Sequence, residues 1–394
     1  MSSQDIFFKH QAQTTPFAKA LEISHSEGMF IYDIDGKPYL DLVAGVSACT
    51  LGHAHPNIIN AINTQVQRYL HVMVYGEYIQ SPQYKLAQLL AQNLPEKLDC
   101  TYFVNSGCEA IEGAMKLAKR KTSRSKIISF HNSYHGSTHG ALSIMGQEHY
   151  KTKYRPLLAD CYQIPYDCIS ALQKIDYQTA AVVVEPIQGA SGFRVPSTLW
   201  LKQLSKRCKE VGAQLIFDEI QTCFGRTGKL FALQTFDIVP DILCLAKGMG
   251  GGMAIGAFIS SKKDMALLKE NPMLGHITTF GGHPVNCAAS LATLQTLLDE
   301  PDIIDSVIRK EKLFRDNLVH PKIKKIRGKG LMLAVELGNK DWCNALVEKG
   351  YENGLITFFF LFTKTSFRIS PPLNISDEQI VKACQKIKHI LNQF

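Results

Sequence analysis

The sequence predicts an α/β fold with a large domain on a mainly parallel sheet and a smaller α+β domain at the C-terminus. Apolar runs of strand length alternate with amphipathic helices in mid-chain, the pattern of strands that helices cover on both faces. The chain has 394 residues, enough for two domains, and its pattern changes near residue 285. We expect an N-terminal arm and hairpin over 1–50 that joins the small domain, a large cofactor-binding domain over 51–285, and a small domain over 286–394.

Composition points to a soluble cytoplasmic protein. Apolar residues make up 45% and charged residues 20% of the chain. No apolar run approaches the roughly 20 residues that span a bilayer, and the N-terminus lacks the basic start of a secretory signal. The 11 cysteines are scattered singly, which favours reduced thiols. The net charge of +8 has no aromatic-interleaved basic patch, so we expect neither nucleic acid nor membrane as a partner.

A hairpin and two helices are expected to precede the sheet. Residues 1 to about 30 are polar and predict an irregular arm, and residues 30–42 alternate around an Asp-Gly turn, which predicts a hairpin. Helices are predicted from Pro56 and over residues 84–93. The apolar residues expected on one face of the first helix are Ile58, Ile59, Ile62 and Val66.

A strand–turn–helix unit follows from residue 101. The strand covers 101–104, the turn is Asn105-Ser106-Gly107, and the helix covers 109–120. A Ser-Gly turn at a helix N-terminus offers free N–H groups, a hydroxyl and the positive end of the helix dipole. We interpret this turn as a candidate phosphate site, although such a turn also serves as an ordinary helix cap.

Three later strands are apolar, and each ends on a charged side chain. They cover residues 180–184 before Glu185, 215–217 before Asp218 and 242–246 before Lys247. A helix over residues 198–211, closed by Gly212, separates the first two strands. Because the carboxyl ends of parallel strands share one edge of a sheet, these three charged side chains should converge there.

The C-terminal part has its own helices and strands. A helix is expected over 287–298, strands over 331–337 and 367–369, and a last helix from Asp377. Ser376 and Gln379 form a capping box at the start of that last helix.

The converging groups suggest pyridoxal phosphate as a cofactor. A partly desolvated lysine loses its proton easily and attacks a carbonyl carbon, and a carboxylate such as Asp218 keeps the pyridine nitrogen protonated. Each residue also has a simpler interpretation: Lys247 as a solvated strand cap, Asp218 as a helix cap, Glu185 as a salt-bridge partner. A metal site at His131, His135 and His139 is disfavoured by the loop residues between them, and no dinucleotide or Walker motif is present.

Eight ordered motifs carry a resemblance to a known family. They are Tyr39-Leu40-Asp41-Leu42, Leu51-Gly52-His53-Ala54-His55-Pro56, Asn105-Ser106-Gly107-Cys108-Glu109-Ala110, Tyr134-His135-Gly136, Glu185-Pro186-Ile187-Gln188-Gly189, Phe217-Asp218-Glu219-Ile220-Gln221, Leu245-Ala246-Lys247-Gly248 and Thr279-Phe280-Gly281-Gly282. With these motifs nearly the whole chain resembles the class III (ω-amino) aminotransferases. That family has the fold-type I architecture, depends on pyridoxal phosphate, and includes acetylornithine and ornithine aminotransferases.

The resemblance implies roles for the residues that match. Lys247 would be the Schiff-base lysine that moves the substrate proton, and Asp218 would pair with the pyridinium nitrogen. The further cofactor-binding residues implied are Ser106, Gly107 and Cys108 at the phosphate, Tyr134 and Ile220 on the two ring faces, Gln221 at the ring hydroxyl, and Glu185. The family usually has Thr or Ala where Cys108 stands.

Two more residues concern the partner subunit and the acceptor. Thr279 would reach the phosphate of the neighbouring subunit, which implies a homodimer with shared sites. Arg368 matches the arginine that binds the acceptor's carboxylate through paired hydrogen bonds.

Two positions depart from the acetylornithine and ornithine pattern. Ser137 stands where those enzymes have an arginine for the donor's carboxylate, and Ala190 stands where the ornithine type has a glutamate that neutralises the acceptor arginine. Arg194 is a candidate for the missing cation by position alone. We therefore expect a donor whose distal end lacks a carboxylate or is bound differently, such as a diamine.

The resulting prediction is an aminotransferase that moves the amino group of an ω-amino compound to a 2-oxo acid such as 2-oxoglutarate or pyruvate. An aminomutase of the same fold is the alternative, and it would need no added 2-oxo acid. A non-catalytic binding protein is a third hypothesis, which the presence of both Lys247 and Asp218 disfavours.

Overall fold

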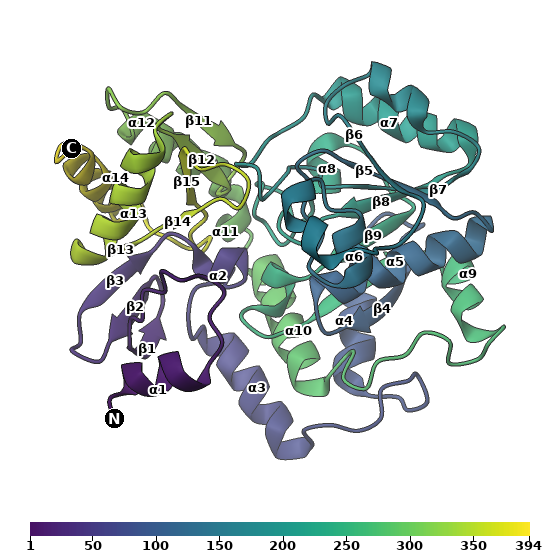
Figure 1. Ribbon diagram of the computed structural model, residues 1–394. Helices are drawn as coiled ribbons and strands as arrows, with labels where there is room; N and C mark the ends of the chain where they lie inside the picture. The colour runs from purple at the N-terminus through teal and green to yellow at the C-terminus, as the bar shows by residue number, and fades with distance from the viewer.

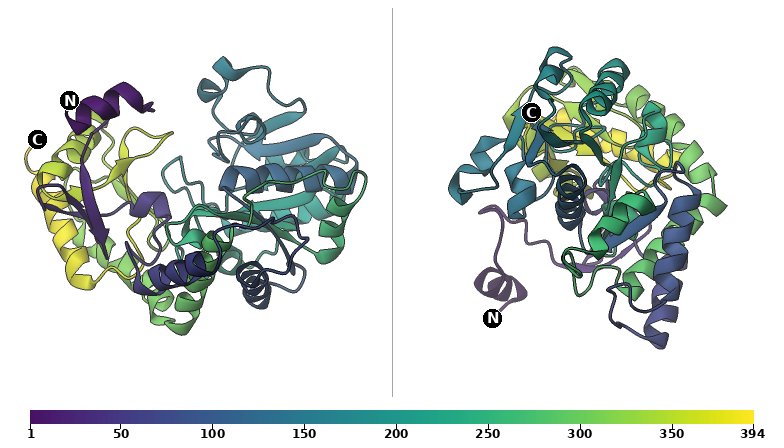
Figure 2. Two further views of the ribbon diagram at one scale, coloured as in Figure 1. Left: turned by 90° about the horizontal axis from the view of Figure 1, so that it is seen from below. Right: turned by 90° about the vertical axis from the view of Figure 1, so that its right-hand side faces the viewer.

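The computed structural model describes all 394 residues and contains three β-sheets surrounded by helices (Figure 1). A sheet of seven strands occupies one side of the molecule. Two sheets of four strands lie on the other side, together with both chain termini (Figures 1 and 2). Helices α3 (Pro56–Arg68) and α10 (Pro284–Asp299) pack against each other between the two sides. None of the helices has the length and apolar character needed to cross a bilayer.

The seven-stranded sheet has the order β4-β10-β9-β8-β7-β5-β6. Its strands are β4 (Cys100–Val104), β5 (Lys126–Phe130), β6 (Cys161–Ile164), β7 (Thr179–Val184), β8 (Gln214–Asp218), β9 (Ile242–Leu245) and β10 (Gly256–Ser260). Strand β10 runs antiparallel to both neighbours, and the remaining strands are parallel to one another. The predicted mainly parallel sheet is confirmed, but β5, β6 and β10 were not predicted.

Helices cover both faces of this sheet because its strands are apolar on both sides. Every residue of β7, β8 and β9 is buried. Helix α5 (Gly107–Thr122) packs on one face, and α7 (Thr198–Val211) packs on the other through the fully buried Trp200. The expected glycine end of α7 is confirmed, since Gly212 adopts φ 69° at its C-cap.

The two small sheets join the ends of the chain. One has the order β1-β2-β3-β13 and the other β11-β12-β15-β14. Their strands are β1 (Ile23–Glu27), β2 (Phe30–Asp33), β3 (Pro38–Asp41), β13 (Leu355–Ile356), β11 (Lys325–Gly328), β12 (Leu333–Glu336), β15 (Ser366–Ile369) and β14 (Phe358–Phe359). The predicted β2–β3 hairpin is confirmed, and β3 pairs in parallel with β13, which ties the N-terminal hairpin to the C-terminal part.

The other α-helices are mostly short or lie on the surface. They are α1 (Ser3–His10), α2 (Ala44–Ser47), α4 (Ser81–Gln92), α6 (His139–Ser143), α8 (Ala232–Phe236), α9 (Lys262–Met265), α11 (Asp302–Asp305), α12 (Val307–Asn317), α13 (Lys340–Glu352) and α14 (Asp377–Leu391). The capping box of α14 is present as predicted, with Ser376 and Gln379 bonded to each other's backbone.

One local prediction was wrong, and another needs qualification. The N-terminal arm is not irregular, because Ser2 and Asp5 form a capping box that starts α1, and β1 pairs with β2. On α3 the predicted apolar residues do lie on one face, but that face is not uniformly buried: Ile58 is buried, whereas Ile59 is 43% and Val66 37% exposed. The apolar face of α3 is therefore only partly covered within this chain.

Candidate active site

The carboxyl ends of the central strands form one pocket. Glu185 after β7, Asp218 at the end of β8 and Lys247 after β9 all line it. Strand β4 is parallel to β9 across β10, so Ser106 and Gly107 at the start of α5 reach the same edge. The cavity has a volume of about 620 Å3. The sheet topology thus brings the predicted nucleophile, carboxylate and phosphate site together.

Lys247 is suited to act as a nucleophile. It follows β9 in a left-handed conformation with φ 45°, an unusual backbone for a side chain of this size. Burial lowers the pKa of its ammonium group, and Arg368 lowers it further, while Asp218 acts in the opposite direction. A lysine with a lowered pKa carries more of the free amine at neutral pH.

Asp218 is held rigidly by two donors. His135 Nδ1 lies 2.7 Å from its Oδ2, and the backbone N–H of Ile220 donates to Oδ1 over 3.1 Å. Both Asp218 and His135 are buried. Neither the Tyr134-His135-Gly136 motif nor the spacing of His135 from His131 and His139 predicted this contact with Asp218, and the structure contains no group of three or more residues able to hold a metal. His135 follows the turn after the parallel strand β5, and this place at the carboxyl edge of the sheet was the signal that could have indicated a role in the pocket.

The start of α5 forms the candidate phosphate site. Ser106 caps the helix by accepting the Glu109 N–H over 3.2 Å. A Cβ atom on Gly107 would lie 2.8 Å from Ile220 Cδ1, so a larger residue there would require the Ile220 side chain to move. A Cβ on Gly136 would equally meet the Cys108 side chain. The two glycines let the turn and the neighbouring loop approach each other closely around the helix N-terminus.

Glu185 lies among backbone donors. Its two carboxylate oxygens accept N–H groups from Tyr134, over 3.0 Å, and from Gly189, over 2.8 Å. Burial raises the pKa of this carboxyl group above its usual value. It forms no ion pair, so the alternative interpretation of Glu185 as a salt-bridge partner is wrong. Its contacts instead hold the loops on both sides of the pocket together.

Gln221 and Tyr134 also line the pocket. Gln221 donates to Ser47 Oγ over 3.4 Å. The Tyr134 hydroxyl lies 3.2 Å from Ser137 Oγ, the residue that replaces the expected arginine.

Arg368 extends from β15 into the same pocket. It is 6% exposed, donates through Nε to the Phe359 carbonyl over 3.2 Å, and leaves Nη1 buried without a partner. Burial lowers the pKa of its guanidinium to about 10, so it remains a cation at neutral pH. An unpaired buried donor is unfavourable unless a ligand satisfies it. This arginine fits a carboxylate that arrives with the substrate.

Two predicted residues lie outside the pocket. Thr279 is exposed and does not line it, which leaves its expected role toward a neighbouring subunit untested. Arg194 is also exposed, and its guanidinium lies 6.0 Å from the ring centre of Tyr166. The suggestion that Arg194 replaces the missing donor cation is therefore wrong for this structure.

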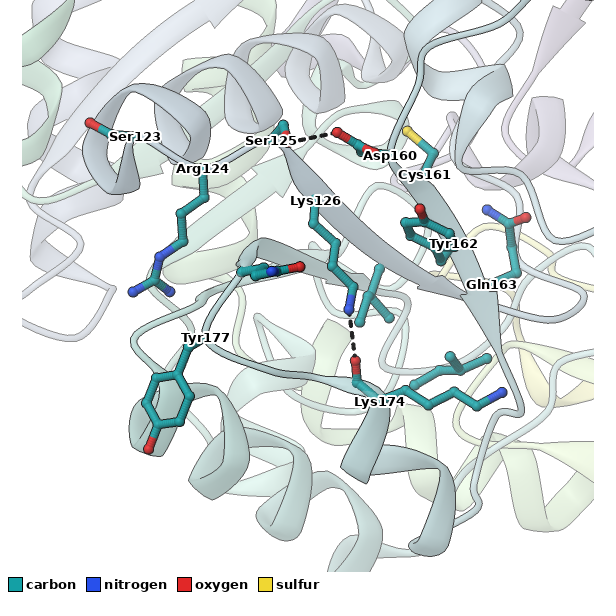
Figure 3. Close-up of a pocket in the computed structure, with 13 residues that line it drawn as sticks. Ser123, Arg124, Ser125, Lys126, Asp160, Cys161, Tyr162, Gln163, Lys174 and Tyr177 are labelled. Carbon is teal, nitrogen blue, oxygen red and sulfur yellow. Dashed lines mark hydrogen bonds between the residues drawn. The ribbon is translucent and has the colours of Figure 1, made fainter.

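A second hollow lies at the opposite edge of the sheet, near the amino ends of β5, β6 and β7 (Figure 3). Lys126 donates there to the Lys174 carbonyl over 3.2 Å and pairs with Asp176 over 2.7 Å, and Ser125 bonds Asp160. These bonds already pair several of the charged groups that line the hollow, and we assign it no role.

The sequence of the chain matches a known protein family. The model of the family described as aminotransferase class-III matches residues 11–391. The chain belongs to the class III aminotransferases. It is 37% identical to the acetylornithine aminotransferase of Methanopyrus kandleri over 368 residues, which cover 93% of this chain and 92% of that one. It is also 37% identical to the putrescine aminotransferase of Pectobacterium atrosepticum, covering 92% of this chain and 81% of the relative.

Solved structures of this family have the same fold. The ornithine aminotransferase of Toxoplasma gondii, whose active site holds pyridoxal phosphate at partial occupancy, superposes with a TM-score of 0.91. It is 32% identical, and the match covers 99% of this chain and 93% of that one. The predicted fold-type I architecture, the pyridoxal phosphate cofactor and the aminotransferase class are thereby confirmed. This class III enzyme transfers amino groups from an amine donor to a 2-oxo acid.

Proposed function

We propose that Lys247 and Asp218 carry the chemistry of the transfer. Pyridoxal phosphate, when bound, supplies an aldehyde carbon that takes up the amine and a ring that withdraws electrons. Lys247 would bind that carbon, give it up to the incoming amine, and then move the proton from the substrate carbon. The buried Asp218 carboxylate would hold a proton on the ring nitrogen. The lowered pKa of Lys247 and the rigid Asp218–His135 pair support these roles.

We propose that the remaining predicted residues orient the cofactor. Ser106, Gly107 and Cys108 would bind its phosphate, an assignment supported by their place in the first turn of α5. The residues assigned to the ring are Tyr134 and Ile220 on its faces, Gln221 at its hydroxyl, and Glu185 beside it; all four line the pocket.

Arg368 is proposed to bind the carboxylate of the acceptor. Its unpaired Nη1 supports this role, because a carboxylate would satisfy that donor and neutralise the buried charge. A 2-oxo acid such as 2-oxoglutarate or pyruvate is the expected acceptor.

The donor is proposed to be a diamine or another ω-amino compound without a distal carboxylate. The observation that carries this proposal is the charge of the pocket: its lysine and arginine side chains are Lys247 and Arg368 alone. Ser137 and Ala190 add no charge, and Arg194 lies outside. A second carboxylate would therefore have no cation of its own. Among the relatives, the putrescine aminotransferase of Pectobacterium atrosepticum acts on a donor of this kind.

A scan of half-reactions tests the donor. The holoenzyme is mixed with one amine at a time and no acceptor, and the absorbance of the bound cofactor is followed. We expect putrescine to convert the cofactor faster than ornithine, N-acetylornithine, lysine, 4-aminobutyrate or β-alanine, and Lys247→Ala to abolish conversion. In the variant Ser137→Arg the ranking should shift toward donors that carry a carboxylate.

Two results would contradict the proposed donor. One is faster conversion by N-acetylornithine or 4-aminobutyrate than by putrescine; the other is an unchanged ranking in Ser137→Arg. Isomerisation of an amine without any acceptor would instead indicate the aminomutase.

We also propose a homodimer whose subunits share active sites. Exposed apolar side chains that support it lie on two adjacent segments: Leu70, Tyr78, Ile79, Met273 and Phe280. These segments touch, since His71 stacks on His283 and Gln83 donates to the Gly282 carbonyl over 2.8 Å. The segment that carries Phe280 also contains Thr279, the residue expected to reach the partner's phosphate. Monomeric proteins seldom expose so large an apolar surface.

The division of the chain into 1–50, 51–285 and 286–394 is proposed on the arrangement of the sheets, with α10 as the connecting helix. A cytoplasmic location is proposed as well. Its support is that all 11 cysteines are free thiols.

A further inference from the structure

The surroundings of Arg368 differ from those of an ordinary buried charge. No carboxylate lies close enough to form an ion pair with it. Two phenyl rings flank the guanidinium instead: Phe360 with its ring centre 4.8 Å from Cζ, and Phe193 at 5.8 Å. The rings also contact each other edge to face, with centres 4.8 Å apart and planes at 90°.

Aromatic faces stabilise a guanidinium without using its hydrogen-bond donors. The negative face of a ring attracts the cation, most strongly where water is excluded. Phe193 and Phe360 are both buried, so this attraction acts in a dry site. A carboxylate in their place would neutralise the charge and occupy the N–H groups. The rings do neither, and Nη1 remains free.

The backbone indicates that this arrangement is held firmly. Phe193 has a φ of 49°, in the left-handed region that a bulky side chain rarely adopts. The hydrogen bond from Arg368 Nε to the Phe359 carbonyl oxygen restrains the other side of the guanidinium. The guanidinium is therefore held in one orientation while its side chain lines the pocket.

We propose that Phe193 and Phe360 are positioning residues that keep Arg368 as a free carboxylate-binding cation in both half-reactions, so that a diamino acid gives up its α-amine. This inference rests on the proposed role of Arg368. Because nothing in the chain neutralises Arg368, the carboxylate of any 2-amino acid binds it and brings the α-amine to Lys247. The α-carbon then loses its amino nitrogen and its hydrogen and gains a carbonyl oxygen from water. Pyridoxal phosphate, when bound, would supply the acceptor for the nitrogen, the hydrogen and two electrons, with its aldehyde oxygen leaving as water.

The first test uses the wild-type holoenzyme and ornithine, with pyruvate as acceptor. Transfer of the α-amine gives 5-amino-2-oxopentanoate, which cyclises to a pyrroline with the carboxylate on the imine carbon. Transfer of the terminal amine gives a semialdehyde, which cyclises to the isomer with the carboxylate on a saturated carbon. We expect NMR to show the first product in excess. An excess of the second product would overturn the inference.

The second test measures carboxylate binding directly. Glutarate, which cannot react, is titrated into the holoenzyme by calorimetry. Phe360→Leu should weaken its binding about tenfold, the loss expected from a desolvated cation–π contact. Phe360→Tyr, which keeps the ring, should bind nearly as the wild type does. Circular dichroism and the absorbance of the bound cofactor check that both variants are folded and loaded.

Two outcomes separate this inference from the function on which it rests. If Arg368→Gln loses glutarate binding while Phe193→Leu and Phe360→Leu retain it fully, the positioning role is wrong and the acceptor site stands. If Arg368→Gln binds glutarate as the wild type does, the proposed role of Arg368 fails, and the inference fails with it.

Discussion

Asp218 and His135 show how one buried pair prepares the site. The imidazole lies 2.7 Å from the carboxylate, and its other nitrogen, Nε2, is buried without a partner. The imidazole of His135 therefore forms a hydrogen bond with Asp218 and with no other residue. Together with the Ile220 N–H it holds the carboxylate in one orientation before any ligand enters.

Replacing Asp218 with Asn tests this arrangement. The change keeps the shape of the side chain and removes its charge, so we expect the donor half-reaction to slow by about 10²–10³-fold, as when other preorganised electrostatic contacts are lost. Stopped-flow absorbance measures the rate. Asp237→Asn is the matched control, since Asp237 is an exposed helix cap with φ 54° that Asn tolerates. An unchanged rate in Asp218→Asn would contradict the role.

His53 makes stability depend on pH. The hydrogen bond that His53 Nε2 donates to the Asp41 carboxylate, and then the neighbouring Cys49, raise the pKa of His53 to about 9. Because the folded state binds the proton more tightly, this stabilisation is complete below the unfolded pKa near 6.5 and is lost as pH rises through 9. We expect the difference in unfolding free energy between wild type and His53→Gln to shrink from pH 6 to pH 9.5 in urea titrations. A constant difference would show that the pair contributes nothing.

At the scale of elements, α5 depends on a glycine that lets it approach the sheet. A Cβ atom on Gly113 would clash with Phe258 Cε1, and Phe258 is fully buried on β10. Alanine favours a helix by about 1 kcal/mol over glycine, but overpacking costs about 1–3 kcal/mol. The ring has no space to move into, so the second effect should win.

We therefore expect Gly113→Ala to lower the free energy of unfolding by about 1–2 kcal/mol, measured by urea unfolding. Phe258→Leu makes room for the new methyl group. It should therefore lower the free energy of unfolding less in the Gly113→Ala protein than in the wild type. A Gly113→Ala protein more stable than the wild type would mean that α5 and β10 are not in close contact.

At the scale of the whole molecule, the apolar segments around Ile79 and Phe280 should be buried between two subunits. Ile79 is 93% exposed in the single chain. We expect sedimentation to give twice the chain mass of 43.9 kDa at micromolar concentration. Ile79→Asp should shift the protein toward monomer and weaken cofactor binding, because Thr279 would then be lost from the partner's site. Tyr177→Asp changes a side chain that is 70% exposed elsewhere and should do neither.

Sequence reasoning succeeded where the signal was local. A charged residue at the end of a buried strand marks the active edge of a parallel sheet. This rule was enough to predict that Glu185, Asp218 and Lys247 lie close together, and all three line one pocket. The capping box at Ser376 was equally local. Strand β10 was not predicted, because a short apolar run indicates neither the direction of a strand nor its neighbours in the sheet.

Contacts between distant parts of the chain could not be predicted. Phe193 and Phe360 meet around Arg368 only because a loop after β7 and the turn before β15 fold over the same pocket. The partial exposure of the apolar face of α3 could not be predicted for a related reason, since a helical pattern shows which face is apolar but not what covers it.

The most direct test of the central claim is to find the lysine that binds the cofactor. Holoenzyme is reduced with borohydride, which makes the bond between cofactor and lysine permanent, and the modified peptide is mapped by mass spectrometry. The account predicts one phosphopyridoxyl group on Lys247, and none in Lys247→Ala. Modification of a different lysine would contradict the assignment of the active site to the pocket at the carboxyl ends of β7, β8 and β9.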